Sequence, residues 1–226
     1  MGTFRTYTLQ IRGNRVTLEN LTIENRAGRV GQAVALHVEG DCVTVRNCRL
    51  LGNQDTLFTG NENSRQYYDR CYIEGTTDYI FGPATCWFDR CILHSKSDSY
   101  ITAASTPKNH KNGYIFYKCD LTASDGVVNV YLGRPWRPYA SVVFLECKMG
   151  RHIRPEGWHN WRNAENEKTA RYAEYASIGE GANPESRVSW SLQLDKDDVS
   201  LYVPESVLGG DWFRKTCIES AHKKSS

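Results

Sequence analysis

The sequence predicts an all-β chain folded as a parallel β-helix, and two observations lead to that prediction. A short apolar pattern with a cysteine at a fixed place recurs along the chain, and the intervals between successive cysteine positions are 27, 23, 20, 28 and 28 residues. Periods of this size are typical of solenoids, in which each repeat forms one coil. Within each copy, apolar residues alternate with other residues, as they do in short strands.

Each copy is expected to contribute two strands joined by a bend, because the alternation breaks for two residues, too few for a helix, and then resumes. One copy cannot bury its own apolar face. Successive copies are therefore expected to stack, with their strands parallel and about 4.8 Å apart. The copies cover residues 16–23, where Leu21 takes the cysteine position, and then 43–50, 68–73, 86–93, 114–121 and 142–149.

The eight cysteines are expected to pack as small apolar side chains. They form no Cys-x-x-Cys pair, and their spacing is the coil period itself. Because free cysteine behaves as a small hydrophobic residue, a column of reduced, buried thiols is expected inside the coils. Adjacent coils lie close enough for a disulfide, so a bond between Cys42 and Cys48, or between two neighbours in the column, stays an alternative.

The composition indicates a single domain over residues 1–226. Of these residues 40% are hydrophobic and 24% are charged, and no apolar run is long enough to span a bilayer. The net charge of +2 is small and dispersed, which argues against a nucleic-acid partner. Residues 1–7 lack the apolar stretch of a signal peptide. We expect a monomer without a membrane partner.

Beyond Cys147 the pattern changes. From residue 151 to residue 189 the coil signal gives way to loops rich in Gly, Asn and Glu. A short helix is predicted from its cap, Asp195, through Tyr202, and a second over residues 204–208, closed by Gly209-Gly210. Because no linker separates them from the coils, both are expected to pack against the side of the solenoid and to close its end.

Two aspartates occupy equivalent points of successive repeats. Residues 51–58 align without a gap on residues 74–81, and Asp55 and Asp78 each lie seven residues beyond a cysteine. Side chains at equivalent positions of adjacent coils are neighbours, so the two carboxylates should face the same way. Repulsion then raises the apparent pKa of one of them, which places a proton donor beside a nucleophile or base, as in hydrolases.

A ladder of aspartates, each bonded to the backbone of its own turn, is the structural alternative for this pair. Asp98 supports that alternative, because it lies seven residues beyond Cys91 and a third coil then carries the same acid. Position alone does not decide between the two interpretations.

Three further features favour a site. Gln32 and Gln54 each precede an alternating strand, so their amides are expected to converge on an oxyanion, although a glutamine there is commonly just solvated. The guanidinium fork of Arg134, between Gly133 and Pro135, suits a carboxylate that must stay ionised. Five aromatic side chains either provide flat surfaces on which sugar rings stack or pack in the core: Tyr79, Phe81, Trp136, Trp158 and Trp161.

Five motifs, in order along the chain, resemble those of pectin methylesterases, the carbohydrate esterases that remove methyl groups from pectin. The resemblance runs from about residue 3 to residue 213. The motifs are Gly31-Gln32-Ala33-Val34-Ala35-Leu36, Gln54-Asp55-Thr56-Leu57, Asp78-Tyr79-Ile80-Phe81-Gly82, Leu132-Gly133-Arg134-Pro135-Trp136 and Gly157-Trp158-His159-Asn160-Trp161.

The resemblance implies a single-stranded, right-handed parallel β-helix with an extended cleft for polygalacturonan. It also implies a secreted enzyme that modifies the cell wall by hydrolysing the methyl esters of galacturonate to free carboxylates and methanol. No metal and no other cofactor take part in that reaction.

The resemblance assigns a role to each residue of the predicted site. Asp78 would be the nucleophile, and Asp55 the acid that protonates the departing methanol and then the base that activates water. Gln32 and Gln54 would stabilise the oxyanion, and Arg134 would orient Asp78. The substrate would be contacted by Phe81, Trp136 and Tyr79.

The chain departs from the family pattern in two places. Tyr79 stands where phenylalanine is usual, which keeps the ring. Ahead of Thr3, family members carry further coils, with a Gly-x-Tyr-x-Glu segment and a capping helix. The chain is therefore expected to lack the N-terminal coils and cap of the family, and its first coil to expose an unpaired strand edge.

Two other functions stay open. A β-helix glycosidase or lyase would act on the same polymer, but inverting glycosidases need carboxylates about 6.5–9.5 Å apart, which is wider than adjacent coils suggest. Lyases of this architecture use calcium held by clustered acids, and no cluster is apparent beyond Asp98. The other alternative is a non-catalytic pectin-binding solenoid fragment, in which the cleft is present but unstable.

Overall fold

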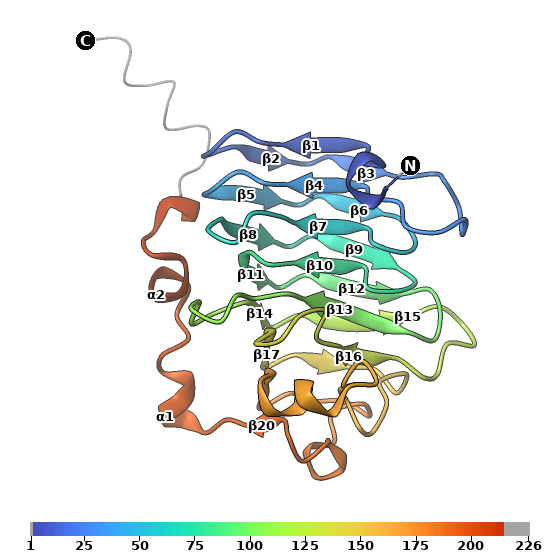
Figure 1. Cartoon of the computed structure of the whole chain (residues 1–226), viewed down its shortest axis with the longest axis vertical. Coiled ribbons are helices and arrows are strands. Elements are labelled where there is room, and N and C mark those ends of the chain that lie inside the picture. Colours follow the sequence, from blue (N-terminus) through green and yellow to red (C-terminus); the bar gives the residue numbers. More distant parts are fainter. Residues whose placement is uncertain (1, 215–226) are drawn as a thin grey trace.

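The chain forms a parallel β-helix, as predicted, in a computed structural model that describes residues 2–214. Successive coils stack along one axis, and each passes through parallel sheets that run the length of the stack (Figure 1). The first sheet consists of β1 (Leu9–Ile11), β4 (Leu36–Val38), β7 (Leu57–Thr59), β10 (Ile80–Gly82), β13 (Tyr100–Ala104) and β16 (Tyr131–Gly133).

Two further sheets complete the coils. The second sheet consists of β2 (Thr17–Glu19), β5 (Val43–Arg46), β8 (Arg65–Asp69), β11 (Thr85–Asp89), β14 (Tyr114–Tyr117), β17 (Ser141–Leu145), β19 (Arg171–Tyr175) and β20 (Leu192–Gln193). The third sheet consists of β3 (Thr22–Glu24), β6 (Arg49–Leu51), β9 (Tyr72–Gly75), β12 (Ile92–Ser95), β15 (Asp120–Ala123) and β18 (Lys148–Met149).

The predicted bend joins the second sheet to the third in every coil. In the coil of β5 and β6, Asn47 separates the two strands with a φ of 47°, in the left-handed region. Residues other than glycine adopt the left-handed conformation mostly as single residues, and one such residue is enough to turn the chain sharply. The same conformation, always just before the cysteine position, recurs at Asn20, Arg70, Arg90, Lys118, Glu146 and Ala176.

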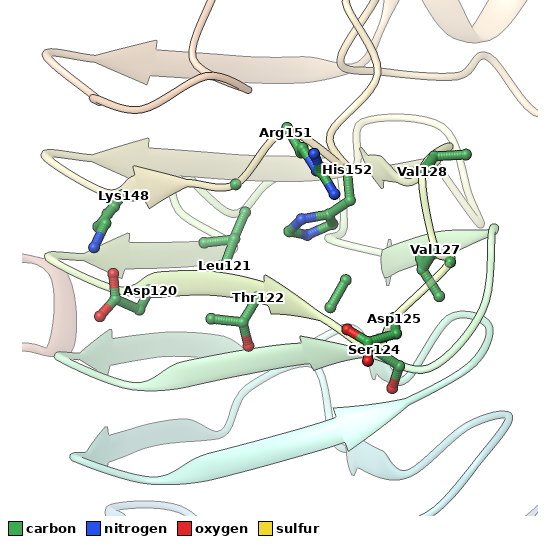
Figure 2. A pocket seen from close by; sticks show the side chains of 13 residues that line it. Asp120, Leu121, Thr122, Ser124, Asp125, Val127, Val128, Lys148, Arg151 and His152 are labelled. Atoms are coloured by element: carbon green, nitrogen blue, oxygen red, sulfur yellow. The ribbon is translucent and has the colours of Figure 1, made fainter.

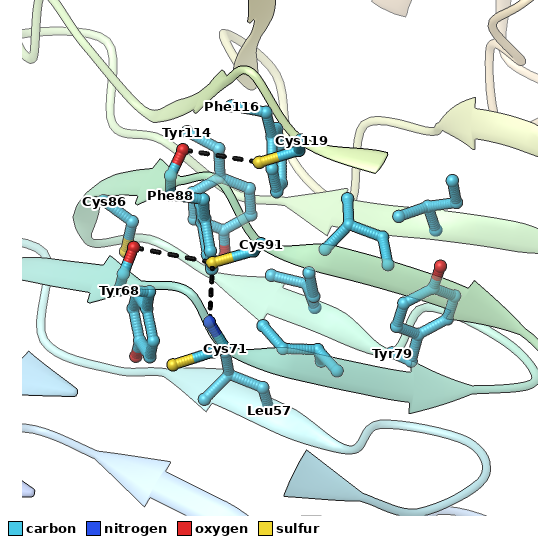
Figure 3. Close-up of a cluster of buried hydrophobic side chains, with 14 of the residues drawn as sticks. Leu57, Tyr68, Cys71, Tyr79, Cys86, Phe88, Cys91, Tyr114, Phe116 and Cys119 are labelled. Atoms are coloured by element: carbon cyan, nitrogen blue, oxygen red, sulfur yellow. Dashed lines mark hydrogen bonds between the residues drawn. The ribbon is translucent and has the colours of Figure 1, made fainter. Parts of the chain in front are cut away.

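The cysteine column is present and buried (Figure 3). All seven described cysteines are free, so the disulfide between Cys42 and Cys48 and the disulfides within the column are not formed. Each thiol of the column donates to a carbonyl two residues earlier, at 3.2 to 3.6 Å. Beside it the rings of Tyr68, Phe88, Phe116 and Phe144 stack at 4.5 to 4.7 Å. The column consists of Cys48, Cys71, Cys91, Cys119 and Cys147.

Thiol titration checks the state of this column. Denatured, unreduced protein is expected to show at least seven reactive thiols per chain, since seven of the eight cysteines are described and free. The folded protein is expected to hide these seven from the same reagent, because all of them are buried. Three or fewer thiols after denaturation would contradict the reduced column.

The coil does not end where its sequence signal ends. Within the predicted loop region of 151–189, β19 continues the second sheet by pairing with β17, and Ile178 bridges to Lys148 of β18. Ser177 takes the cysteine position of this coil, and its Oγ accepts a hydrogen bond from the Cys147 backbone at 3.3 Å. The prediction of loops alone is wrong here, because the pattern was defined by a cysteine that this coil lacks.

Two short helices lie along the second sheet, as predicted (Figure 1). Asp195 caps α1 (Lys196–Val199) and forms a capping box with Asp198, although the helix ends earlier than the predicted Tyr202. The second, α2 (Pro204–Leu208), ends at Gly209 with a φ of 64°. Its Val207 and Leu208 pack with Tyr67, Trp87 and Phe213 on the outer face of the sheet.

Short 3₁₀ helices occupy the turns at residues Thr3–Arg5, Ala164–Lys168, Pro184–Ser186 and Trp212–Arg214. Within residues 2–214, no helix is both long and apolar enough to cross a membrane.

Candidate active site

Asp55 and Asp78 take equivalent positions on two adjacent coils, as the repeat alignment predicted. Leu57 of β7 pairs with Ile80 of β10, so the residues two places earlier are also in register. Both aspartates have a left-handed backbone, with φ of 66° and 49°, which short polar residues accept more readily than others. Their side chains therefore leave the coil in the same direction, just ahead of the first sheet.

The coil of β13, which follows that of Asp78, does not carry an equivalent acid. Ile80 pairs with Thr102, which places Tyr100 and not Asp98 in register with Asp78. Ser95 pairs with Gly75, so the chain takes seven residues from Ser95 to reach Thr102 but only five from Gly75 to reach Ile80, and counting from the cysteine therefore gave the wrong residue. Asp98 is exposed, and the backbone N–H groups of Val128 and Asn129 donate to its Oδ1 at 2.8 and 2.9 Å, which lowers its pKa. The aspartate ladder is thereby confined to two coils.

A cavity of about 330 Å³ opens on the outer face of the first sheet and contains the aspartate pair. Seven of the eight residues predicted for the site line it, together with four others. Its lining consists of Thr3, Phe4, Gln32, Gln54, Asp55, Asp78, Phe81, Ala103, Arg134, Trp136 and Trp161.

Arg134 binds the Asp78 carboxylate through two hydrogen bonds. Its Nε donates to Oδ1 at 3.0 Å and its Nη2 to Oδ2 at 2.6 Å, a geometry that a guanidinium fork makes and a lysine does not. The arginine follows directly on β16, where Gly133 lies close to the neighbouring strand. A Cβ on Gly133 would lie 2.0 Å from the Thr102 Oγ1, so only glycine brings this strand end near enough.

Burial and charge separate the acidities of the two carboxyls. Asp78 and Asp55 are only 5% and 3% exposed, and burial raises the pKa of each. At Asp78 the hydrogen bonds and positive charge of Arg134 oppose that rise. At Asp55 the negative charge of Asp78 adds to the effect of burial, Arg134 offsets only part of it, and the pKa rises to about 7. Below that pH, Asp55 carries a proton beside the more acidic Asp78.

Gln32 and Gln54 reach the cavity from neighbouring coils. The two residues form an isolated parallel bridge, and the backbone N–H of Ala33 donates to the Gln54 carbonyl at 3.1 Å. The hydroxyl of Thr3 donates to Oε1 of Gln32. With its oxygen engaged in this way, the amide of Gln32 has its N–H₂ group left to donate into the cavity.

The aromatic residues of the site divide between the cavity and the core. Phe81 packs with Phe58 and Ala103 on the outer face of the first sheet, and the Trp136 ring lies 5.9 Å from that of Phe81. Tyr79 is different, because it precedes β10 and does not follow the alternation that turns Phe81 outward. It is fully buried in the core (Figure 3), and its hydroxyl lies 3.2 Å from the Ser95 Oγ. The expectation that Tyr79 contacts substrate is therefore wrong.

A second cavity, of about 370 Å³, lies on the third sheet between β15 and the chain after β18 (Figure 2). Its carboxylates, Asp120 and Asp125, are both exposed, and it contains none of the predicted site residues. His152 lines it with a ring that burial keeps neutral by lowering its pKa to about 4. Although larger, this cavity has no buried carboxylate pair.

Comparison with known proteins agrees with the geometry. The Pectinesterase family model matches residues 1–211. This chain belongs to the pectinesterase family. It is 42% identical over 207 residues to Pectinesterase 31 of Arabidopsis thaliana and 39% identical over 211 residues to Putative pectinesterase 11 of the same plant. These alignments include 91% and 92% of this chain but 65% and 58% of the two relatives, so the chain spans less than two thirds of their length.

Solved structures of pectin methylesterases share the fold of this chain. Pectin methylesterase from carrot is 29% identical, with a TM-score of 0.88 over 93% of this chain and 70% of its own. The enzyme from Aspergillus niger is 31% identical, with a TM-score of 0.83 over 92% of this chain and 67% of its own.

Replacing Asp55 by asparagine is expected to stabilise the folded chain at alkaline pH. The carboxyl titrates near 3.8 when unfolded and at about 7 when folded, so its destabilising effect grows as the pH rises between these values and is complete above 7. At about 1.36 kcal/mol per pKa unit, Asp55→Asn should raise the free energy of unfolding by roughly 4 kcal/mol at pH 8. The gain should nearly vanish at pH 4.

Denaturant unfolding at pH 8 and pH 4 measures this effect, with Asp98→Asn as a matched control. Backbone hydrogen bonds lower the pKa of Asp98, so its removal should reduce stability at pH 8, the opposite sign. An equal change in both variants would contradict the assigned acidity of Asp55.

Proposed function

We propose that this chain is a pectin methylesterase, which hydrolyses the methyl esters of polygalacturonate to free carboxylates and methanol. The observation that carries the proposal is the buried pair of Asp55 and Asp78, of which one is held by the Arg134 fork and the other has a pKa of about 7. Such a pair supplies a nucleophile and a proton donor at the same pH.

In the first half of the reaction, an oxygen of the Asp78 carboxylate attacks the ester carbonyl carbon. The carbonyl oxygen becomes an oxyanion, which the side-chain amides of Gln32 and Gln54 stabilise by donating hydrogen bonds. The carbon–oxygen bond to the methoxy group then breaks. The carboxyl of Asp55 gives its proton to the leaving group, so methanol departs and an acyl-enzyme anhydride remains.

In the second half, Asp55 is a carboxylate and acts as a base. It takes a proton from a water molecule, and the resulting hydroxide attacks the galacturonyl carbon of the anhydride. The same two amides stabilise the second oxyanion. Collapse breaks the anhydride bond, restores the Asp78 carboxylate and releases galacturonic acid, which gives its proton to the solvent, while Asp55 is again protonated.

The relatives support the substrate in this proposal. Two structures similar to this chain are pectin methylesterases in complex with hexasaccharides, one of them an aspartate-to-alanine mutant, and they are 27% and 28% identical to it. The apolar ring of Phe81, with Trp136 beside it, gives the methylated sugar a flat surface within the cavity. We propose an extracellular, monomeric protein, in line with its family.

Methanol release from highly methylated polygalacturonate tests the proposal. The protein is expected to release methanol and an equal amount of titratable acid, with no new reducing ends and no unsaturated product. New reducing ends would indicate a glycosidase, and unsaturated ends a lyase. Binding to the polymer without any product would indicate a pectin-binding solenoid, and each of these results would overturn the proposal.

A further inference from the structure

The Arg134 guanidinium is enclosed by two aromatic rings. Its Cζ lies 3.9 Å from the centroid of the Tyr100 ring and 3.8 Å from that of the Trp161 ring. Two rings at that distance cannot share one face of the guanidinium, so they cover opposite faces. The edge of the group remains free for its two hydrogen bonds to Asp78. We call Tyr100 and Trp161 the aromatic clamp.

The sheet register sets the position of Tyr100. Tyr100 begins β13 and occupies the place that Asp78 occupies in the preceding coil. It pairs with Tyr131 of β16, and the two rings stack at 5.3 Å with an angle of 14° between their planes. The Tyr100 ring is thus fixed by its stacking on Tyr131 of the next coil, and it also contacts the Arg134 guanidinium. It does not line the cavity that contains the carboxylates.

Trp161 comes from a loop held in an unusual conformation. Trp161 and Arg162 are consecutive residues with φ of 61° and 56°, a region that residues with bulky side chains avoid. Two side chains brace the turn: His159 Nδ1 accepts the Trp161 N–H at 3.0 Å, and Asn160 Oδ1 accepts the Arg162 N–H at 2.8 Å. A strained backbone of this kind persists only where the surrounding contacts stabilise it. Here the conformation places the Trp161 indole against the Arg134 guanidinium.

We propose that Tyr100 and Trp161 are positioning residues, which fix the Arg134 guanidinium in the plane of the Asp78 carboxylate. An unconfined arginine side chain has many rotamers, and stacking on aromatic faces removes most of them. With both faces covered, the guanidinium stays on Asp78 when a sugar ring enters the cavity. The inference rests on the proposed function and deepens it, because it assigns to two rings the geometry on which the nucleophile depends.

Replacement of Tyr100 tests the clamp without altering the cavity lining. In Tyr100→Leu, Arg134 is expected to oppose the burial of Asp78 less effectively, so the pKa of Asp78 rises and the acidic limb of the kcat profile moves up by about one pH unit. At the optimum, kcat should fall about tenfold, with little change in KM. Tyr100→Phe keeps the ring and should restore both the limb and kcat. Trp161→Leu should move the limb likewise, but KM should also rise because Trp161 lines the cavity.

Tyr72→Leu is the matched control. Tyr72 also carries an arginine on its ring, with the Arg49 Cζ at 4.3 Å, but it lies on the third sheet. Its loss should leave the acidic limb in place. A folded, active Tyr100→Leu protein with an unmoved acidic limb would overturn the proposal, as would an equal shift in Tyr72→Leu.

A second measurement separates this proposal from the proposed function. Carbon-13 NMR titration of the Asp78 carboxyl needs no turnover, and it should give a higher pKa in Tyr100→Leu than in the wild type, Tyr100→Phe or Tyr72→Leu. If the wild type releases no methanol, the proposed function fails while this titration still decides the clamp. An unchanged Asp78 pKa in Tyr100→Leu would overturn the clamp even in an active esterase.

Discussion

Replacing Asp78 by asparagine is expected to lower kcat for methanol release by about 10⁴-fold or more, because the neutral amide is not a nucleophile. Asparagine has the same shape and tolerates the left-handed φ of 49° at this position, so the fold should persist. The KM for methylated polygalacturonate should change much less than kcat, since Phe81 and Trp136 still line the cavity. Initial rates of methanol release, over a range of polymer concentrations, separate the two quantities.

Asp98→Asn is the control for this substitution. It makes the same chemical change at an aspartate that lies outside the cavity, and its activity should remain close to that of the wild type. Thermal unfolding should show that both variants are folded. An Asp78→Asn protein that kept more than about a tenth of the wild-type kcat would remove Asp78 from the role of nucleophile.

Replacing Arg134 by alanine is expected to lower kcat by about 10²-fold and to move the acidic limb of its pH profile upward. The sign follows from two opposing effects on Asp78. Burial raises its pKa, and Arg134 lowers it, so loss of the arginine leaves the effect of burial unopposed. Since the reaction needs the ionised form of Asp78, activity on the acidic side should then be lost at a higher pH than in the wild type.

Arg134→Lys distinguishes charge from geometry. Lysine restores the cation but not the two-point contact, so it should recover part of kcat and return the acidic limb towards its wild-type position. If Arg134 only packed between rings and held its loop, both variants would lose stability while their pH profiles stayed in place. An unmoved acidic limb in an active, folded Arg134→Ala protein would therefore contradict its role.

The repeat pattern predicted the coils and the aspartate pair for one physical reason. Stacked strands keep a constant register, so residues at the same distance from a repeated core position become neighbours. That reasoning placed Asp55 beside Asp78 correctly, because the spacing between paired positions is the same in both coils, seven residues from Leu50 to Leu57 and seven from Ile73 to Ile80. It failed for Asp98, because the spacing from Leu93 to Thr102 is nine residues, and the two extra residues bring Tyr100 into register. Turn length is set locally and is not constrained by the core pattern.

The repeat pattern did not predict the direction of the Tyr79 side chain or the rings around Arg134. Side-chain direction alternates along a strand, and the left-handed backbone at Asp78 decides which way Tyr79 points, a detail that the residue types do not reveal. The enclosure of Arg134 joins Tyr100 to Trp161, which is 61 positions further along the chain and comes from a loop without periodic pattern. The sequence around Arg134 and the family resemblance both identified this arginine, whereas only the structure identifies the two rings that enclose it.

Carbon-13 NMR titration of the aspartate carboxyls tests most directly whether burial and Arg134 divide the two carboxyls into a proton donor and a nucleophile. Signals that disappear in Asp55→Asn and in Asp78→Asn assign the pair. Asp55 should titrate at about 7, and Asp78 should titrate at a lower pH than Asp55. In Asp78→Asn, the pKa of Asp55 should fall, because the neighbouring negative charge is gone. A pKa of Asp78 above that of Asp55, or a pKa of Asp55 near its ordinary value of 3.8, would contradict the assignment of donor and nucleophile.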